Sequence, residues 1–232
     1  MTRIDAARVA EVETSLRRRF RVAETPVPLG TRTLTILHPA SAEELINEVD
    51  FERDERLPYW AELWPSALVL AELVLSMRGA GSTFLELGCG AGLVATAAAL
   101  AGYRVRATDY YDDALRFTAV NVGRNANASG FTAEHLDWRA LPRSTDRFDV
   151  VAAADVLYER PYGILVAKAF GAMLAPGGVG FLADPGRVAR DEFLSALPTH
   201  GLEVVEERPI PFVHDKVRQT ISVFGIAHRA GK

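Results

Sequence analysis

Three glycines at alternate positions, Gly88, Gly90 and Gly92, follow an apolar run that ends near Glu86. Glycines in such a turn let the backbone leave a strand sharply and approach a ligand closely, because a Cβ atom there would collide with it. Glu86 adds a carboxylate beside the turn, which suits a ligand with an ammonium group better than one with phosphates. A second apolar run ends in Asp109, which is placed to accept hydrogen bonds from the two hydroxyls of a ribose. These residues predict a site for a nucleoside that carries an amino group.

The spacing of the glycines separates this turn from two other nucleotide-binding loops. The dinucleotide fingerprint G-x-G-x-x-G directs a helix N-terminus at a pyrophosphate. Here the third glycine comes one residue early, and Leu93 occupies the place of the expected glycine. No Lys-Ser or Lys-Thr pair follows the turn, which excludes a phosphate-cradling P-loop. A tight turn that binds no ligand is the alternative.

Two later strand-like runs also end in residues that could serve such a site. Asp137 offers a carboxylate to the amino group of an adenine, and Trp138 offers an indole against its face. Three alanines that end at Ala154 leave space for the close approach of a ligand. Asp155 and Tyr158 follow at a spacing of three, so that one turn can present both side chains to one cavity. The alternatives are that Asp155 caps the next helix and that Tyr158 is a packing aromatic.

The elements that position these residues alternate between strand and helix. Such alternation with short connections predicts an α/β protein with a doubly wound, mostly parallel, seven-stranded Rossmann-like sheet. The expected strands span 83–87, 104–109, 131–136, 147–154 and 178–183, with two more near 202–208 and 218–227, and the expected helices span 91–101, 112–127, 161–174 and 188–197. No helix separates the last two strands, so the final strand is expected to run antiparallel. In such sheets ligands bind beyond the carboxyl ends of the strands, where the strand order reverses.

The first 56 residues are expected to form an N-terminal helix and hairpin extension of a single domain, residues 1–232, whose catalytic core is 57–232. The expected elements are an amphipathic helix over 4–20, a hairpin of 20–23 and 31–37, a helix from Ser41 to about Val49, and an acid-rich loop over 50–56. Pro65 suits the first turn of a further helix. That helix is apolar on nearly all sides, so it is expected to be buried.

The composition excludes several classes of protein. The chain has 232 residues and a formal net charge of -4, so its overall charge does not indicate nucleic-acid binding. It has no apolar stretch of membrane-spanning length and no apolar signal-peptide core, so the expected location is the cytoplasm. Cys89 is the one cysteine, which excludes an internal disulfide, and no Cys/His cluster has zinc-ligand spacing, so no metal is expected. Nothing in the sequence indicates an oligomeric state.

The chain resembles methyltransferase family 16, a group of seven-stranded S-adenosylmethionine (SAM)-dependent enzymes. The resemblance covers about residues 55–185 and is carried by the paired tryptophans of 57–67, the glycine turn, Asp109, Leu136-Asp137-Trp138 and Asp155-Val156-Leu157-Tyr158. It implies that SAM is the cofactor and that Trp64 and Trp138 line its site, whereas Trp60 is expected in the core. It also implies that Asp155 and Tyr158 border the channel of the methyl acceptor.

The family includes many protein lysine methyltransferases, among them the branch that acts on the electron-transfer flavoprotein β subunit. That branch carries a glycine pair where this chain has Ser66 and Ala67. We therefore expect an N-methyltransferase that acts on a protein lysine or, alternatively, on a small-molecule amine or a nicotinamide-like pyridine. Asp155 and Tyr158 would be the catalytic residues, which orient the amine and pass its proton toward solvent. A SAM-binding module without activity is the third alternative, and the intact Asp155 and Tyr158 pair argues against it.

Overall fold

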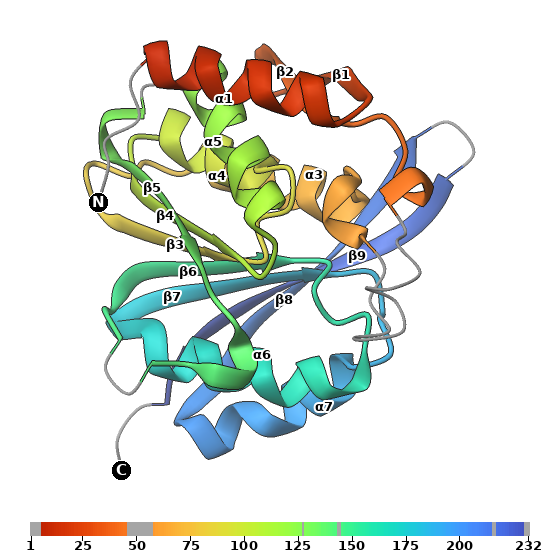
Figure 1. Ribbon diagram of the computed structural model, residues 1–232. Coiled ribbons are helices and arrows are strands. Elements are labelled where there is room, and N and C mark those ends of the chain that lie inside the picture. Colours follow the sequence, from red (N-terminus) through yellow and green to blue (C-terminus); the bar gives the residue numbers. More distant parts are fainter. Residues whose placement is uncertain (1–5, 46–57, 127, 143–144, 215–216, 230–232) are drawn as a thin grey trace.

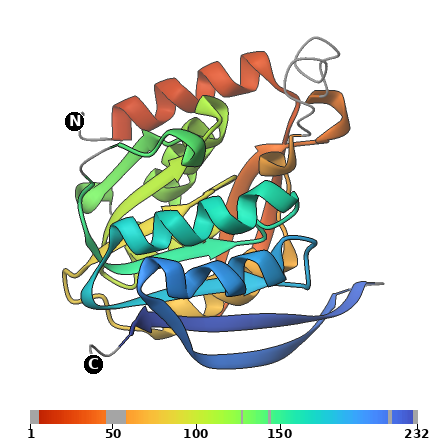
Figure 2. The same cartoon turned by 90° about the horizontal axis from the view of Figure 1, so that it is seen from below.

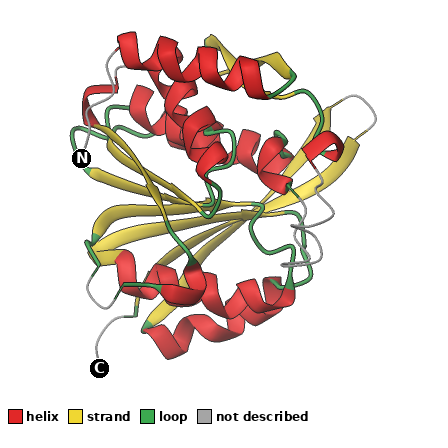
Figure 3. Cartoon of the chain, in the orientation of Figure 1, coloured by secondary structure: helices red, strands yellow, loops and turns green. Residues whose placement is uncertain are grey.

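The computed structural model describes residues 6–45, 58–126, 128–142, 145–214 and 217–229. A seven-stranded sheet lies between two layers of helices (Figures 1 and 3). Its strands are β3 (Thr83–Leu87), β4 (Arg104–Asp109), β5 (Phe131–His135), β6 (Phe148–Ala154), β7 (Leu174–Asp184), β8 (Leu202–His214) and β9 (Val217–His228). The order is β5-β4-β3-β6-β7-β9-β8, and β9 runs antiparallel to both of its neighbours. The predicted sheet and its antiparallel final strand are therefore confirmed.

The sheet buries both faces because helices cover both. One face carries α3 (Pro65–Ser76), α4 (Leu93–Leu100) and α5 (Asp112–Asn125), and the other carries α6 (Arg160–Met173) and α7 (Arg190–Ala196) (Figure 1). Alternate residues of β3 point to opposite faces. Phe84 accordingly joins the core under α3 and α4, whereas Leu85 and Leu87 join the core under α6. Glu86 shares the face of Phe84.

The N-terminal part packs against α5. Helix α1 (Ala6–Arg19) crosses α5 so closely that a Cβ atom on Gly123 would lie 2.3 Å from a methyl carbon of Val9. Strands β1 (Val22–Leu29) and β2 (Arg32–Pro39) form a separate antiparallel pair. The expected helix and hairpin are confirmed.

Some predicted boundaries differ from the structure. The helix expected from Ser41 is, in its described part, only a 3-10 turn over Glu43–Leu45; residues 46–57, with the acid-rich stretch, lie outside the described residues. The helix expected at 91 begins at Leu93, because Gly92 before it has a left-handed backbone with φ of +81°. Strand β8 runs to His214, six residues beyond its predicted end at 208.

Asn121 of α5 ties the β1–β2 hairpin to the glycine turn. Its side chain accepts a hydrogen bond from the backbone N–H of Leu37 at 2.7 Å and donates to the carbonyl oxygens of Leu37 and Ala91 at 2.7 and 2.8 Å. The side chain is fully buried. Its bonds thus connect residues that are far apart in the sequence.

Replacing Asn121 by alanine should lower the free energy of unfolding by about 3 kcal/mol, because buried backbone groups would lose their partners. Urea unfolding measures this difference. Asn125→Ala is the control, since Asn125 is only half-buried and its side chain bonds the backbone of Thr35 and Asn121. A loss no larger for Asn121→Ala than for Asn125→Ala would contradict the anchoring role of Asn121.

The β8–β9 hairpin extends past the neighbouring strand. Strand β7 ends at Asp184, which pairs with Ser222, so β9 before Ser222 and its partners in β8 continue beyond the end of β7. Figure 2 shows this hairpin projecting from the molecule. Strand β8 is the last strand of the sheet and contains Pro209 and Pro211, while β1 contains Pro26 and Pro28. Both strands therefore carry prolines at alternate positions.

No helix within the described ranges is long and apolar enough to cross a membrane.

Candidate active site

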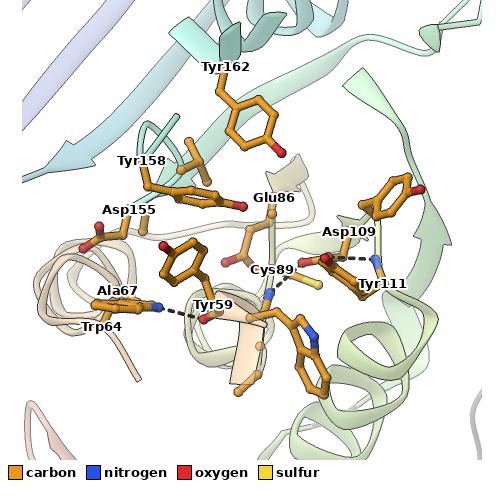
Figure 4. Close-up of a pocket in the computed structure, with 18 of the residues that line it drawn as sticks. Tyr59, Trp64, Ala67, Glu86, Cys89, Asp109, Tyr111, Asp155, Tyr158 and Tyr162 are labelled. Atoms are coloured by element: carbon orange, nitrogen blue, oxygen red, sulfur yellow. Dashed lines mark hydrogen bonds between the residues drawn. The ribbon is translucent and has the colours of Figure 1, made fainter. Parts of the chain in front are cut away.

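Every residue that the sequence analysis assigned to the cofactor or to the acceptor lines one pocket, here called the main pocket. It lies at the carboxyl ends of β3, β4 and β6. The strand order reverses here, because β4 lies on one side of β3 and β6 on the other. Figure 4 shows Asp155, Trp64 and Ala67 at one end of this pocket and Asp109 and Tyr111 at the other, with Glu86 between them.

The three glycines of the turn all adopt left-handed backbone conformations. Their φ angles are +72° at Gly88, +52° at Gly90 and +81° at Gly92. A Cβ atom on Gly92 would lie 2.7 Å from the Cα atom of Thr118, and one on Gly88 would lie 2.9 Å from a methyl carbon of Val156. The turn thus requires glycine both for its conformation and for its packing.

Glu86 is buried, with 2% of its surface exposed, and its Oε2 atom has no hydrogen-bond partner among the described residues. Burial raises the pKa of this carboxyl well above its ordinary value, and the charge of Asp109 adds to that rise, while the backbone N–H of Ala95 opposes it. A buried polar atom without a partner is costly. A ligand ammonium group would satisfy it, so Glu86 fits the amino-acid tail of SAM.

Asp109 is held by the backbone around it. Its Oδ2 atom accepts a hydrogen bond from the N–H of Gly90, and its Oδ1 atom accepts one from the N–H of Tyr111, each at 3.0 Å. Burial raises the pKa of this carboxyl, and the backbone N–H groups of Tyr111, Gly90 and Tyr110 oppose the rise. A carboxylate has about four acceptor sites, so it can also accept from a ligand hydroxyl. Asp109 therefore stabilises the turn around it, and this contact is compatible with a ligand role.

Asp137 and Trp138 lie beyond β5. The Asp137 carboxylate accepts hydrogen bonds from the backbone N–H of Arg139 at 3.0 Å and from its guanidinium at 2.7 Å. The Trp138 ring packs perpendicular to Tyr162 and lies beside Gly88. Its buried Nε1–H has no acceptor among the described residues. Both residues line the main pocket, and Asp137 is also engaged by Arg139.

The two neighbouring tryptophans occupy different surroundings. Trp60 packs against Phe20 and Phe117 in the core between α1 and α5, as predicted, although it also lines the main pocket. Trp64 precedes α3 and donates from Nε1 to the carbonyl oxygen of Tyr59 at 2.8 Å. Trp64 therefore stands at the end of the pocket that holds Asp155.

Asp155 follows β6 with a φ of +58°, a conformation that non-glycine residues rarely adopt and that often marks functional sites. Its Oδ2 atom accepts a hydrogen bond from the hydroxyl of Ser66 at 2.7 Å, and its Oδ1 atom accepts one from Nε of Arg187 at 2.6 Å. The side chain is only 2% exposed. Asp155 does not cap α6, because Glu159 occupies that position. Ser66, at the position that departs from the flavoprotein branch, thus holds this carboxylate.

Tyr158 belongs to a row of aromatic side chains. Its ring centroid lies 4.5 Å from that of Tyr59 and 5.2 Å from that of Tyr162. Burial, with a smaller contribution from Tyr162, raises the pKa of the Tyr158 phenol well above its ordinary value. Tyr158 therefore stays a neutral phenol, which can donate and accept hydrogen bonds but does not act as a phenolate base.

Three further residues at this site, Arg187, Tyr59 and Tyr162, were not predicted from the sequence. Arg187 lies in the turn after β7, where Asp184 accepts hydrogen bonds from the backbone N–H groups of Gly186 at 2.7 Å and Arg187 at 2.9 Å. Ligands bind beyond the carboxyl ends of the strands in such sheets. The turn after the fifth expected strand, 178–183, is therefore a place where the sequence could have indicated Arg187.

A second cavity, here called the side cavity, shares Tyr59, Trp64, Asp155 and Tyr158 with the main pocket. The rest of its lining consists of Gly186, Arg187 and Val188. The four shared residues, three aromatic rings and one carboxylate, border both spaces and are here called the neck. This arrangement can hold a nucleoside on one side and a cationic side chain on the other.

A family model described as lysine methyltransferase matches residues 47–194. The chain belongs to this family. Similar curated proteins include the mouse protein-lysine methyltransferase METTL21E, 35% identical over 116 residues that cover 45% of this chain and 47% of the relative. The protein N-lysine methyltransferase METTL21A of Xenopus tropicalis is 31% identical over 138 residues, which cover 56% of this chain and 63% of the relative. The chain thus spans less than two thirds of the length of these relatives.

Solved structures share the fold. A SAM-dependent methyltransferase of Streptococcus mutans has a TM-score of 0.63 at 11% identity and covers 88% of this chain and 55% of its own. The glycopeptide N-methyltransferase MtfA, complexed with sinefungin, has a TM-score of 0.54 at 15% identity and covers 70% of this chain and 92% of its own. These likenesses confirm the predicted Rossmann-like methyltransferase fold.

Proposed function

We propose that this lysine methyltransferase family member is a SAM-dependent N-methyltransferase that acts on the side chain of a protein lysine. The observation that carries the proposal is the neck, whose residues line both the main pocket and the side cavity. Its aromatic rings and the buried carboxylate of Asp155 suit an alkylammonium group next to a nucleoside site. The names of the METTL21 relatives support lysine as the acceptor.

On the cofactor side, Glu86 would accept hydrogen bonds from the ammonium group of SAM through its unpartnered buried oxygen. Asp109 would accept from the ribose hydroxyls with the acceptor capacity that its backbone donors leave. The orientation of Asp109 is already fixed, so little ordering is needed when the ligand binds.

On the adenine side, Trp138 would lie against the ring and Asp137 would accept from the exocyclic amino group. Gly88, together with Gly90 and Gly92 in the same turn, would let the backbone approach the ligand. Ala154 supports this because it is the small residue at the end of β6 that lines the same pocket.

Bound SAM supplies a methyl group on a sulfonium, from which a neutral thioether leaves. The protein must then align the acceptor nitrogen, which is the positioning part of catalysis. A lysine amine has a pKa near 10.4, so presenting it neutral at pH 7.4 costs on the order of 4 kcal/mol. Asp155 would orient the amine and accept its proton, which then passes toward solvent. Tyr158 would hold the amine through its neutral hydroxyl. The rings of Tyr59 and Trp64 would keep water from the neck.

The test is incubation of the protein with radiolabelled SAM and a cell lysate, followed by separation of macromolecules from small molecules. Label should appear in the macromolecular fraction and, after acid hydrolysis, in methylated lysine. Asp109→Ala protein is the control, because it should bind SAM weakly. Label confined to the small-molecule fraction would instead identify a small-molecule amine or pyridine as the acceptor, and no transfer to either would remove the proposed activity.

Binding of S-adenosylhomocysteine should quench the tryptophan fluorescence, because Trp64 and Trp138 line the main pocket. Most of the change should vanish in the Trp64→Phe, Trp138→Phe double variant. Titration of wild type and variant measures the effect. The chain has three tryptophans, so a full change in the double variant would assign the signal to Trp60.

A further inference from the structure

One cation of the protein itself lies against the neck, on the side of the side cavity. Arg187 donates from Nε to Oδ1 of Asp155 at 2.6 Å, and its guanidinium carbon lies 5.0 Å from the centroid of the Trp64 ring. A carboxylate combined with an aromatic face is the arrangement by which proteins bind alkylammonium groups. Arg187 therefore fills a site whose chemistry suits a ligand cation.

Arg187 lies on the side-cavity side of the neck. Gly186, Arg187 and Val188 line the side cavity and not the main pocket, whereas Asp155 and Trp64 line both spaces. Arg187 thus lines the side cavity next to residues that border both spaces. An acceptor side chain that entered by this cavity would meet the guanidinium at Asp155.

The attachment of Arg187 allows its side chain to move while its backbone stays fixed. Asp184 holds the backbone N–H groups of Gly186 and Arg187, and Asp184 itself is fully buried. The Arg187 side chain is 33% exposed, whereas that of Asp155 is 2% exposed. The guanidinium can therefore leave for solvent, and the carboxylate cannot.

We propose that Arg187 holds the acceptor site when no substrate is bound and is exchanged for the cationic head group of the incoming acceptor side chain. The nature of that acceptor, a primary alkylammonium, rests on the proposed function. A buried carboxylate that loses its partner is strongly destabilised. Exchange of one cation for another keeps Asp155 paired in both states, so an ammonium group enters without that penalty.

The exchange makes Arg187 a specificity-determining residue. A neutral acceptor, such as a pyridine ring, cannot replace the guanidinium without leaving Asp155 unpaired. The site therefore selects a cationic amine over a neutral ring of similar size.

The experiment measures binding of n-butylammonium chloride, without SAM or acceptor, by calorimetry and tryptophan fluorescence. Arg187→Ala protein should bind this probe at least tenfold more tightly than wild type, because the competing cation is gone. The Asp155→Asn, Arg187→Ala double variant should not bind butylammonium more tightly than wild type. For 1-butanol, a neutral probe of similar shape, Arg187→Ala should not raise the affinity. The probe should also raise the melting temperature of Arg187→Ala protein, since it restores a partner to Asp155.

Equal binding of butylammonium by wild type and Arg187→Ala protein would overturn the proposal, as would an equal gain for 1-butanol. Arg187→Gln is the second variant, and if neither folds, the ion pair maintains the fold and the exchange is also overturned. These measurements need no methyl transfer. A wild-type protein that does not methylate lysine would therefore remove the proposed function without affecting the result for butylammonium. Equal binding of butylammonium by the two proteins would remove the exchange without affecting the proposed function.

Discussion

Asp155→Asn protein should transfer methyl groups about 10²-fold more slowly than wild type, or slower still, with SAM affinity within a few-fold of wild type. Asparagine keeps the size of the side chain but cannot carry the charge that orients an ammonium group and receives its proton. The Arg187 guanidinium would also lose its ionic partner. Single-turnover rates at saturating SAM measure the chemical step, and calorimetry measures SAM affinity.

Ser66→Ala is a matched control for this variant. It removes the hydrogen bond to Oδ2 of Asp155 but leaves the charge and the ion pair with Arg187 in place. Its rate should fall less than that of Asp155→Asn. A fully active Asp155→Asn enzyme would remove Asp155 from the mechanism and leave the positioning of the amine to Tyr158.

Asp109→Ala should weaken SAM binding by about 1.5–3 kcal/mol, the range for loss of a charged hydrogen-bond partner. This corresponds to a dissociation constant about 10 to 150 times larger. The loss has two sources: the ribose hydroxyls lose their acceptor, and the backbone N–H groups of Gly90 and Tyr111 lose theirs, which loosens the glycine turn.

Calorimetric titration with SAM checks this prediction. Asp112→Ala is the control, because Asp112 is an exposed acidic residue in the first turn of α5 and lies outside the main pocket lining. Its affinity for SAM should match wild type. Unchanged affinity in Asp109→Ala would remove Asp109 from the cofactor site, and no SAM binding by folded wild-type protein would remove the cofactor assignment itself.

Local pattern was sufficient for the parts of this protein that depend on neighbouring residues. A strand and the few residues after it determine the glycine turn, Asp109 and the end of β6. Since ligands bind beyond the carboxyl ends of parallel strands, these residues were expected together at that edge of the sheet. Those residues do line one pocket. Their roles toward the cofactor and the acceptor remain predictions.

Contacts between distant segments could not be predicted in the same way. The bonds of Asp155 join Ser66 at the start of α3 to Arg187 after β7, and no local pattern specifies that these three elements meet. The position of β9 between β7 and β8 is likewise set by sheet assembly. The helix from Ser41 was expected because Ser41 followed three residues later by Glu44 is a capping-box pattern, but in the described part Glu44 pairs with Arg21.

The prolines of β8 bear on how the protein behaves at high concentration. An open strand edge is a template on which another copy can add a strand. Proline is tolerated in an edge strand where its nitrogen faces away from the neighbouring strand, and there it offers no N–H to an added strand. Pro209 and Pro211 thus remove two successive backbone N–H donors from the free edge of β8. Pro26 and Pro28 do the same in β1. The long projecting hairpin can therefore stand in solution with little tendency to seed aggregation.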